Sequence, residues 1–294
     1  MMKEKPFSSM HTHTIFCDGR NDVETMCRAA YENNLYAIGF SAHAPVAKQT
    51  GRDSTWNLKQ ERVAEYVEQV LAAKKRWQEK LNVFLGYEVD YIKGLRSVHD
   101  SDIKALNLDY TIGSVHYIYP ANGAEPFTVD GSAEEFEKGV KEGFGGDVEA
   151  LMHCYYDAVT EMTAMGGFDI LGHADLLKKN CQGKNYWPQE SELCRQKEIA
   201  HAVAKAGVIV EVNTGGINRK KIDDVYPSLP FLRFIREYDI PVIITADAHR
   251  AEHICGNYDI AVQTLIQAGF DEHVLITGRK NGKILLKKEK ITKI

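Results

Sequence analysis

Two short motifs near opposite ends of the sequence combine side chains that bind transition metals. The first is His11-x-His13 and the second is Asp247-x-His249. On a β-strand, residues two positions apart face the same side, so each pair can hold one ion between its side chains. Imidazole and carboxylate ligands together suit Zn²⁺, Mn²⁺ or Fe²⁺ better than Ca²⁺. The motifs therefore predict a transition-metal site that draws on distant parts of the chain, with Glu88 as a carboxylate able to bridge two ions.

Residue types that bind metals recur where the sequence indicates the ends of strands. Seven apolar, β-branched runs are candidate strands: 7–12, 37–41, 83–89, 110–115, 168–172, 208–212 and 242–246. At their ends stand, in chain order, His11 and His13, His43, Glu88, His116, His173, Glu211 and Asn213, and Asp247 and His249. A single histidine after a strand is more often structural than functional. Histidines in the same position on most of the seven runs favour one shared site.

Helix-like segments separate these runs and determine how the strands can be arranged. Amphipathic patterns indicate helices at 23–33, 58–80, 134–143, 147–165, 190–206, 229–238 and 257–268. Regular alternation of strand and helix is typical of an α/β fold with a parallel sheet. At this length a parallel barrel similar to the TIM barrel is expected, and the carboxyl ends of its strands meet at one face. That face is where barrel enzymes carry their active sites, so the strand-end residues should converge there.

The remaining sequence favours one domain over residues 1–294. No linker rich in proline, glycine or serine divides the chain, and the short glycine-rich stretch 143–146 suits a turn between two helices. The tail after His273 predicts two short strands around Asn281-Gly282 with a structural role.

Composition limits the class of protein and its surroundings. The net charge is −5, which argues against sequence-independent binding of nucleic acid. No apolar run has the roughly 20 residues of a membrane span, and the N-terminal segment has no apolar signal region. The six cysteines form no CxxC pair and no visible disulfide framework. We therefore expect a cytoplasmic protein with no nucleic-acid or membrane partner.

Seven ordered segments resemble those of the polymerase and histidinol phosphatase (PHP) family, most closely its histidinol-phosphatase branch. They are MHTHTIFCDG, FSAHAP, LGYEVDY, IGSVHYI, ILGHADL, EVNTGG and ITADAH, and they extend from His11 to His249. The resemblance implies a distorted (β/α)7 barrel. It also implies histidinol-phosphatase activity, the metal-dependent hydrolysis of L-histidinol phosphate to L-histidinol and phosphate in histidine biosynthesis.

The resemblance also implies two or three divalent ions, Zn, Mn or Fe, and a ligand set for each. The first ion would bind His11, His13, Glu88 and Asp247. The second would share Glu88 and add His116 and His173. The third would bind Asp18, His43 and His249. All of these residues except Asp18 were already singled out by their position at strand ends.

Catalytic and substrate-binding roles follow for a second group of residues. The expected reaction is direct attack of hydroxide on phosphorus, without a covalent intermediate. Asp18 and His43 would act on the leaving alkoxide, either as ligands of the third ion or as proton donors. The family's arginine before a Tyr-Tyr or Tyr-Phe pair is missing from Met152-His153-Cys154-Tyr155-Tyr156. Arg219 is the preferred substitute, because it follows the sixth predicted strand on the active face. The alternatives are His153, Arg195 and Arg250.

Glu211 and Asn213 are the expected substrate contacts. Glu211 could pair with a cationic amine and Asn213 could contact the amino-alcohol portion, although both could instead be hydrogen-bonding fixtures at a strand end. Cys17 is expected to pack beside the site without binding metal.

Three other functions compete with this hypothesis. The first is a phosphoesterase of the same fold with a different phosphate ester substrate, including a 3′–5′ nuclease, although a nuclease should carry a basic groove with aromatic side chains. The second is a non-catalytic metal-binding regulatory module, which the full set of ligand types opposes. The third is an amidohydrolase; such barrels often use a lysine ligand at a strand end, and no predicted strand here ends in lysine.

Overall fold

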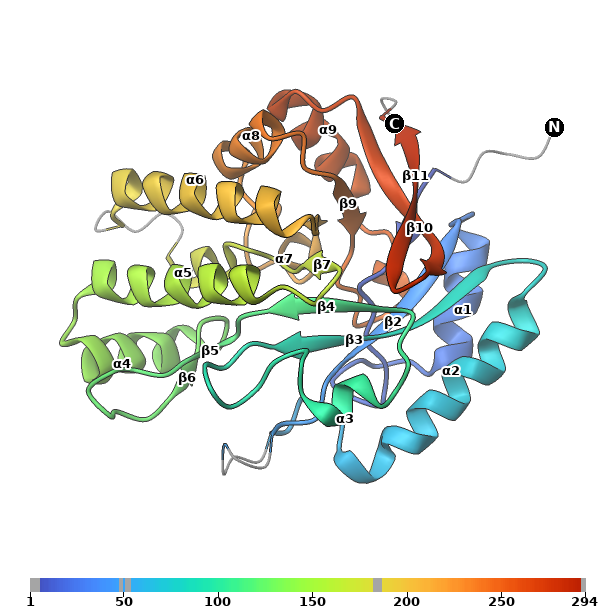
Figure 1. The fold of residues 1–294 in the computed structure, drawn as a ribbon, viewed down its shortest axis with the longest axis horizontal. Coiled ribbons are helices and arrows are strands. Elements are labelled where there is room, and N and C mark those ends of the chain that lie inside the picture. Colours follow the sequence, from blue (N-terminus) through green and yellow to red (C-terminus); the bar gives the residue numbers. More distant parts are fainter. Residues whose placement is uncertain (1–5, 48–49, 51–53, 182–186, 292–294) are drawn as a thin grey trace.

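Seven parallel strands form the centre of the protein (Figure 1). The computed structural model describes residues 6–47, 50, 54–181 and 187–291. In spatial order the strands are β1 (Ser8–Ser9), β2 (Ala37–His43), β3 (Asn82–Asp90), β4 (Tyr110–Ser114), β7 (Ile170–Leu171), β8 (Ile209–Asn213) and β9 (Val242–Thr245). Beyond the first and last strands, the backbones at Thr12 and Ala248 form a parallel bridge. The sheet therefore closes nearly into a barrel, which confirms the predicted α/β barrel.

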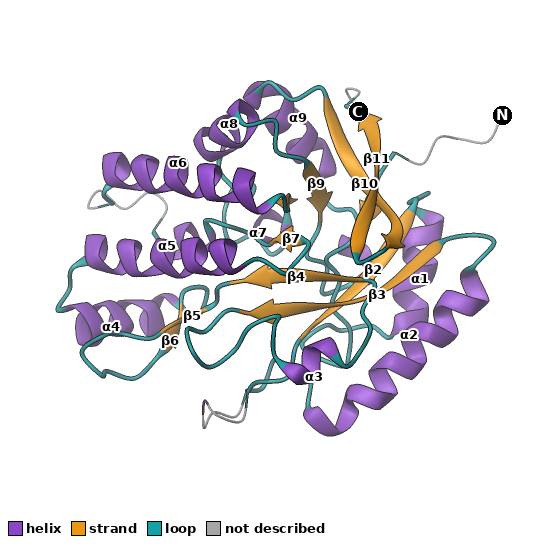
Figure 2. Cartoon of the chain, in the orientation of Figure 1, coloured by secondary structure: helices purple, strands orange, loops and turns teal. Residues whose placement is uncertain are grey.

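Helices surround the barrel, as Figure 2 shows in purple. The longer ones are α1 (Val23–Glu32), α2 (Val63–Trp77), α4 (Ala133–Phe144), α5 (Val148–Met165), α6 (Gln189–Ala206), α8 (Leu229–Glu237) and α9 (Tyr258–Ala268). Shorter helical turns are η2 (Gln60–Arg62), α3 (Ser101–Lys104), η3 (Leu176–Asn180), α7 (Gly215–Asn218) and η4 (Ala251–His253). Each of the seven predicted helices is present.

Local capping residues explain where several helices begin. The Asp22 side chain accepts a hydrogen bond from the backbone of Thr25 at the start of α1. Ser132 and Glu135 form a reciprocal capping box at the start of α4. Such caps satisfy backbone N–H groups that have no partner within the helix.

Inside the barrel, one large aromatic side chain packs against glycines on two neighbouring strands. The Tyr110 ring lies against the backbones of Gly39 and Gly86, where an added Cβ would come within 2.5 Å of the Tyr110 side chain. Its hydroxyl donates a hydrogen bond to the carbonyl of Met10 at 2.6 Å. A side chain larger than hydrogen at either glycine would displace this ring, because close-packed interiors have no spare volume.

A C-terminal hairpin and a small excursion complete the fold. The antiparallel strands β10 (Glu272–Lys280) and β11 (Lys283–Lys290) form the predicted pair around Asn281-Gly282. Val274 and Ile276 of β10 join the apolar cluster inside the barrel, so the hairpin helps to close that core. Between β4 and α4, strands β5 (Tyr117–Ile118) and β6 (Phe127–Thr128) form a short hairpin that the sequence analysis did not predict.

The helix predicted at 58–80 begins later than expected. The backbone N–H of Leu58 donates to the carbonyl of His43 at the end of β2, which holds Leu58 in a buried loop. The turn η2 follows and α2 starts at Val63. Leu58 is therefore apolar because it is buried in a loop, and not because it belongs to the apolar face of a helix.

Candidate metal centre

Six histidines and three carboxylates meet at the carboxyl ends of the parallel strands. All nine residues proposed from the sequence as ligands lie together there, although they span residues 11 to 249 of the chain. The convergence follows from topology, because parallel strands place their carboxyl ends on one face of a barrel.

The residues assigned to the first ion face one another. His11 Nε2 lies 3.1 Å from Glu88 Oε2 and 3.7 Å from Asp247 Oδ1. His13 Nε2 lies 3.3 Å from the same Asp247 oxygen. Asp247 has a φ of 47°, a left-handed backbone conformation that is uncommon outside glycine. Strained backbone of this kind is found where a side chain must be held in a functional position.

Glu88 occupies the middle of the cluster. Its Oε1 lies 2.9 Å from His173 Nε2 and 3.5 Å from His116 Nε2, the residues assigned to the second ion. Its Oε2 faces His11 and, at 2.9 Å, His43 Nδ1. A carboxylate with both oxygens directed at different histidines is placed to bridge two ions.

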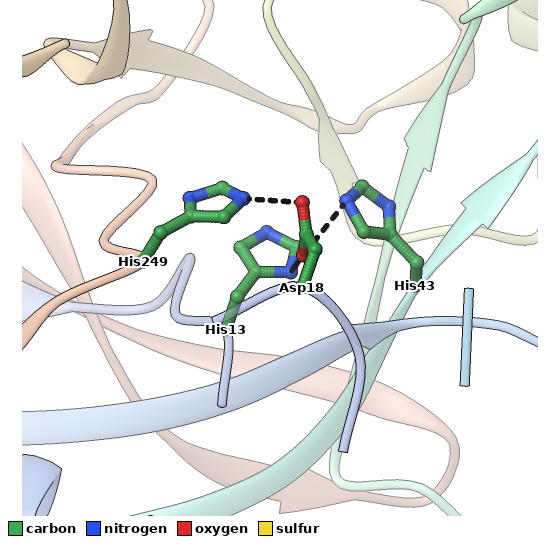
Figure 3. A group of neighbouring side chains, drawn as sticks. All are labelled: His13, Asp18, His43 and His249. Atoms are coloured by element: carbon green, nitrogen blue, oxygen red, sulfur yellow. Dashed lines mark hydrogen bonds and ion pairs between the residues drawn. The ribbon is translucent and has the colours of Figure 1, made fainter. Parts of the chain in front are cut away.

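The residues assigned to the third ion form the outer group, shown in Figure 3. His249 Nε2 lies 3.0 Å from Asp18 Oδ2, and His43 Nε2 lies 3.7 Å from Asp18 Oδ1. His13 joins this group, since its Nδ1 lies 3.6 Å from Asp18 Oδ1. Asp18 comes from the loop after β1, so a loop residue completes a site otherwise built from strand ends.

The chemistry of the cluster fits divalent cations. Several of its buried polar atoms have no hydrogen-bond partner among the described residues: His11 Nε2, His13 Nε2, Asp18 Oδ1, His43 Nδ1 and Glu88 Oε2. Buried polar atoms are nearly always satisfied in native proteins, so a group of them facing one another indicates a missing partner. Metal ions between these nitrogens and oxygens would supply that partner, and the side chains can hold divalent metals.

The electrostatics of the cluster support this interpretation. Burial lowers the pKa of His11, but three neighbouring carboxylates outweigh it and raise that pKa well above its usual value. Burial also raises the pKa of Glu88, but the surrounding histidines hold that pKa well below its usual range. Burial and two adjacent imidazoles lower the pKa of His13 to about 3. The carboxylates therefore stay ionised and attract positive charge, so a divalent ion that binds His11 must displace its proton, while His13 is already neutral, as a metal ligand must be.

Glu211 and Asn213 are not placed as substrate contacts. Both side chains are fully buried beneath the histidines and neither lines the cavity above them. Glu211 Oε1 accepts from His11 Nδ1 at 2.6 Å, and Asn213 donates to Glu211 Oε2 at 3.0 Å. The expectation that they contact substrate is therefore corrected: they are hydrogen-bonding fixtures that fix the orientation and tautomer of His11.

The sequence analysis missed a second carboxylate with this function. Asp90 Oδ1 lies 2.7 Å from His116 Nδ1 and both side chains are buried. The signal was its spacing, because Asp90 follows Glu88 by two residues on β3 and so lies on the same face. Cys17 packs beside His13 as expected, with Sγ 3.4 Å from His13 Nδ1. Burial raises the pKa of Cys17 to about 12, and among the described residues Cys17 belongs to none of the side-chain groups placed to hold a metal ion.

A cavity of about 710 Å³ opens above the cluster. Its floor includes Asp18, His43, Glu88 and other members of the cluster. Three basic side chains also line it, Lys138 on α4, Lys179 and Arg219. Arg219, in the segment after β8, donates to Asp247 Oδ2 at 3.0 Å. Lys179 lies on η3, six residues after His173, and was not anticipated from the sequence.

His153 does not reach this cavity. It is exposed on α5, where its Nε2 lies 3.8 Å from Glu149 one helical turn away. The nearby residues Tyr155 and Tyr156 on the same helix are buried and pack in the core. The proposal that His153 replaces the missing arginine is therefore wrong, and Arg219 remains.

Comparison with known proteins agrees with the fold and identifies the family. Residues 9–215 match the PHP domain family, and the chain belongs to this family. A "Probable histidinol-phosphatase" of Deinococcus radiodurans is 27% identical over 260 residues, which are 88% of this chain and 92% of that protein. Among the described residues, no helix is long and apolar enough to cross a membrane.

Two solved structures share the fold. A candidate histidinol phosphatase of Listeria monocytogenes has a TM-score of 0.73 at 23% identity, covering 85% of this chain and 98% of that chain. The histidinol phosphate phosphatase of Lactococcus lactis, solved with zinc, L-histidinol and phosphate, has a TM-score of 0.64 at 18% identity. It covers 95% of this chain and 98% of that chain.

Proposed function

We propose that this protein is a histidinol-phosphatase, a metal-dependent phosphomonoester hydrolase that converts L-histidinol phosphate to L-histidinol and phosphate. The observation that carries the proposal is the cavity itself. Its floor is a cluster of metal-binding side chains, and Arg219 and Lys179 line the same space. Divalent ions and basic side chains together supply positive charge that suits the binding and hydrolysis of a phosphate group.

The relatives support the same substrate. The Deinococcus radiodurans protein matches over most of both chains, and it is named as a histidinol-phosphatase. The Lactococcus lactis structure holds both products of that reaction together with zinc. We assign two or three ions of Zn, Mn or Fe to the cluster, with the ligand sets given above.

The protein side chains divide the work of the reaction. Bound divalent ions lower the pKa of water toward about 7 and neutralise phosphate oxygens. Arg219 and Lys179 hold the phosphate, and the contact of Arg219 with Asp247 fixes its guanidinium against the floor. His43 lines the cavity and directs Nε2 toward Asp18, so this pair is placed to act on the leaving alkoxide, with or without a third ion.

Phosphate release tests this function directly. Metal-stripped protein should be inactive, and Mn²⁺ or Zn²⁺ should restore rapid release from histidinol phosphate but slow release from a generic phosphomonoester. Single-stranded DNA should not be cleaved. Preference for DNA or for the generic ester would replace the substrate assignment, and no turnover by the metal-loaded protein would favour a regulatory role.

A further inference from the structure

The outer wall of the cavity comes from a part of the chain that supplies no proposed metal ligand. Residues 117–146 leave the barrel between β4 and α5 and include β5, β6 and α4. The ribbon in Figure 1 places this excursion on one side of the barrel, beside α5. Its cavity-lining residues with charged side chains are Glu125, Asp130, Glu135, Glu142 and Lys138. The charged side chains of this segment therefore give that part of the cavity wall a net negative charge.

Asp130 is the member of this wall with the best-defined position. It lies in the turn between β6 and α4, and its neighbours are anchored on both sides. The Val129 N–H donates to the carbonyl of the predicted metal ligand His116 at 2.9 Å. Asn180 of η3 donates to the carbonyls of Val129 and Gly131, at 2.9 and 3.3 Å. Lys179 donates to the carbonyl of Asp130 itself.

These anchors fix the backbone of Asp130 relative to the metal centre but leave its carboxylate available. Among the residues that the structure describes, the carboxylate makes no hydrogen bond or ion pair. It is half-buried and lines the cavity. A carboxylate held by its backbone, with no partner of its own, is placed to accept hydrogen bonds from a bound molecule.

The charges around Asp130 show which part of the cavity it faces. Burial lowers the pKa of Lys179, and Asp130 opposes that effect. Asp130 is also one of several carboxylates that raise the pKa of His116 against the effect of burial. Its carboxylate therefore lies within electrostatic range of both the proposed phosphate position and the second metal position. Lys179 also contacts the backbone of Asp130, so a phosphate ester bound by Lys179 would lie close to Asp130.

An aromatic surface completes this part of the cavity. Trp56 and Tyr117 both line it, and their rings are stacked with centroids 5.4 Å apart and an interplanar angle of 21°. Trp56 also contacts the edges of His43 and His116. A flat aromatic surface next to a carboxylate suits a substrate that carries both a planar ring and a positive charge.

We propose that Asp130 is a specificity-determining residue that accepts a hydrogen bond from the protonated amine of the substrate. The cavity then selects phosphomonoesters of cationic amino alcohols: phosphate lies on the floor with Arg219 and Lys179, and the ammonium lies against Asp130. This inference rests on the proposed phosphatase function and adds the residue that recognises the amine. It also replaces the role that the sequence had suggested for Glu211.

The test compares two substrates that differ only in the amine. Metal-loaded wild-type protein is assayed with histidinol phosphate and with 3-(imidazol-4-yl)propyl phosphate, which lacks the amino group. The wild type should prefer histidinol phosphate, and Asp130→Asn should lower kcat/KM for it by roughly 10- to 100-fold, the range for one hydrogen bond to a charged group. Most of that loss should be in KM, and the des-amino ester should be unaffected. Glu134→Gln, at the start of α4 four residues further on and outside the cavity lining, is the matched control and should leave both substrates unchanged.

Other results would overturn the inference in distinguishable ways. Equal turnover of the two esters by the wild type would remove amine recognition but keep the phosphatase function. An equal loss on both esters in Asp130→Asn would show that Asp130 acts on Lys179, His116 or the leaving group. Metal content and thermal unfolding of the variant identify any general structural damage. If the wild type hydrolyses neither ester, the proposed function fails and this inference fails with it.

Discussion

Replacing Glu211 by glutamine should weaken metal binding without introducing a cavity. The Glu211 carboxylate accepts four hydrogen bonds inside the protein. Oε1 accepts from His11 Nδ1 and Thr245 Oγ1, each at 2.6 Å. Oε2 accepts from the backbone N–H of His173 at 2.8 Å and from Asn213 Nδ2 at 3.0 Å. All four partners donate in this arrangement, and the His173 N–H and the Asn213 NH₂ group can only donate, so Oε2 must remain an acceptor.

Glutamine has nearly the same shape but places an NH₂ group against two of these donors. On the Oε2 side it would face the fixed N–H of His173. On the Oε1 side it would face His11 Nδ1, which could accept only if its proton moved to Nε2, the atom directed at the metal position. With the NH₂ group on the Oε2 side, two bonds to a charged group are lost, at about 1.5 to 3 kcal/mol each, or about 3 to 6 kcal/mol in total. With the NH₂ group on the Oε1 side, the Thr245 hydroxyl can turn to accept from it, so one such bond is lost. Metal affinity should fall at least 10- to 100-fold, the usual effect of removing a residue that orients a ligand.

Metal content after dialysis against a weak chelator, together with denaturant unfolding of metal-free protein, would measure these two effects. Thr245→Val is the control, because it removes one donor and keeps the carboxylate. Unchanged metal affinity and unfolding within about 0.5 kcal/mol, a typical surface-substitution effect, would refute the reasoning. A rise in KM alone would restore Glu211 as a substrate contact.

Three further perturbations test other parts of the site and fold. Arg219→Ala should weaken inhibition by inorganic phosphate by about 1.5 to 3 kcal/mol, the value of one charge-assisted contact; unchanged inhibition would move the phosphate to Lys179. Asp90→Asn should lower metal content and activity together, since it frees His116 to change tautomer; full metal occupancy would contradict this role. Burial lowers the pKa of His273 to about 4, so the unfolded chain binds more protons than the folded protein between about pH 6.5 and 4, and stability should fall as pH falls through this window. Urea unfolding of His273→Phe should show a weaker pH dependence there, and an identical slope would exclude His273 as the cause.

Much of the metal centre could be predicted because its determinants are local in the sequence. The strands were indicated by short apolar runs, and the ligand types stood at their ends. His11 and His13 share a face because of the two-residue repeat of a strand, whatever the rest of the chain does. Once the alternation of strand and helix indicated a parallel barrel, the convergence of these ends followed from topology alone. The family and the barrel are confirmed, and the assignment of individual ligands stays a prediction.

The wrong predictions concern how deeply a side chain is buried and which way it points, and both depend on how the whole molecule packs. Glu211 ends a strand like the proposed ligands, but its side chain points below the histidines and not into the cavity. His153 stands just before the Tyr155-Tyr156 pair in the sequence, but it lies on the side of α5 that faces solvent. Neither fact is encoded in residue spacing, because each depends on which neighbours cover that side of the element.

The residues we assign to substrate recognition were the least accessible to sequence reasoning. Lys179, Asp130 and Trp56 come from loops and short turns with no periodic pattern, and their positions are set by contacts with distant segments, such as the bonds from Asn180 to the turn around Asp130. The amino-acid sequence by itself determined the fold class, the face that carries the chemistry and the ligand types. Only the tertiary structure decided which carboxylates are hydrogen-bonded to the histidines and which line the cavity. That difference depends on burial and on hydrogen-bond partners from elsewhere in the chain.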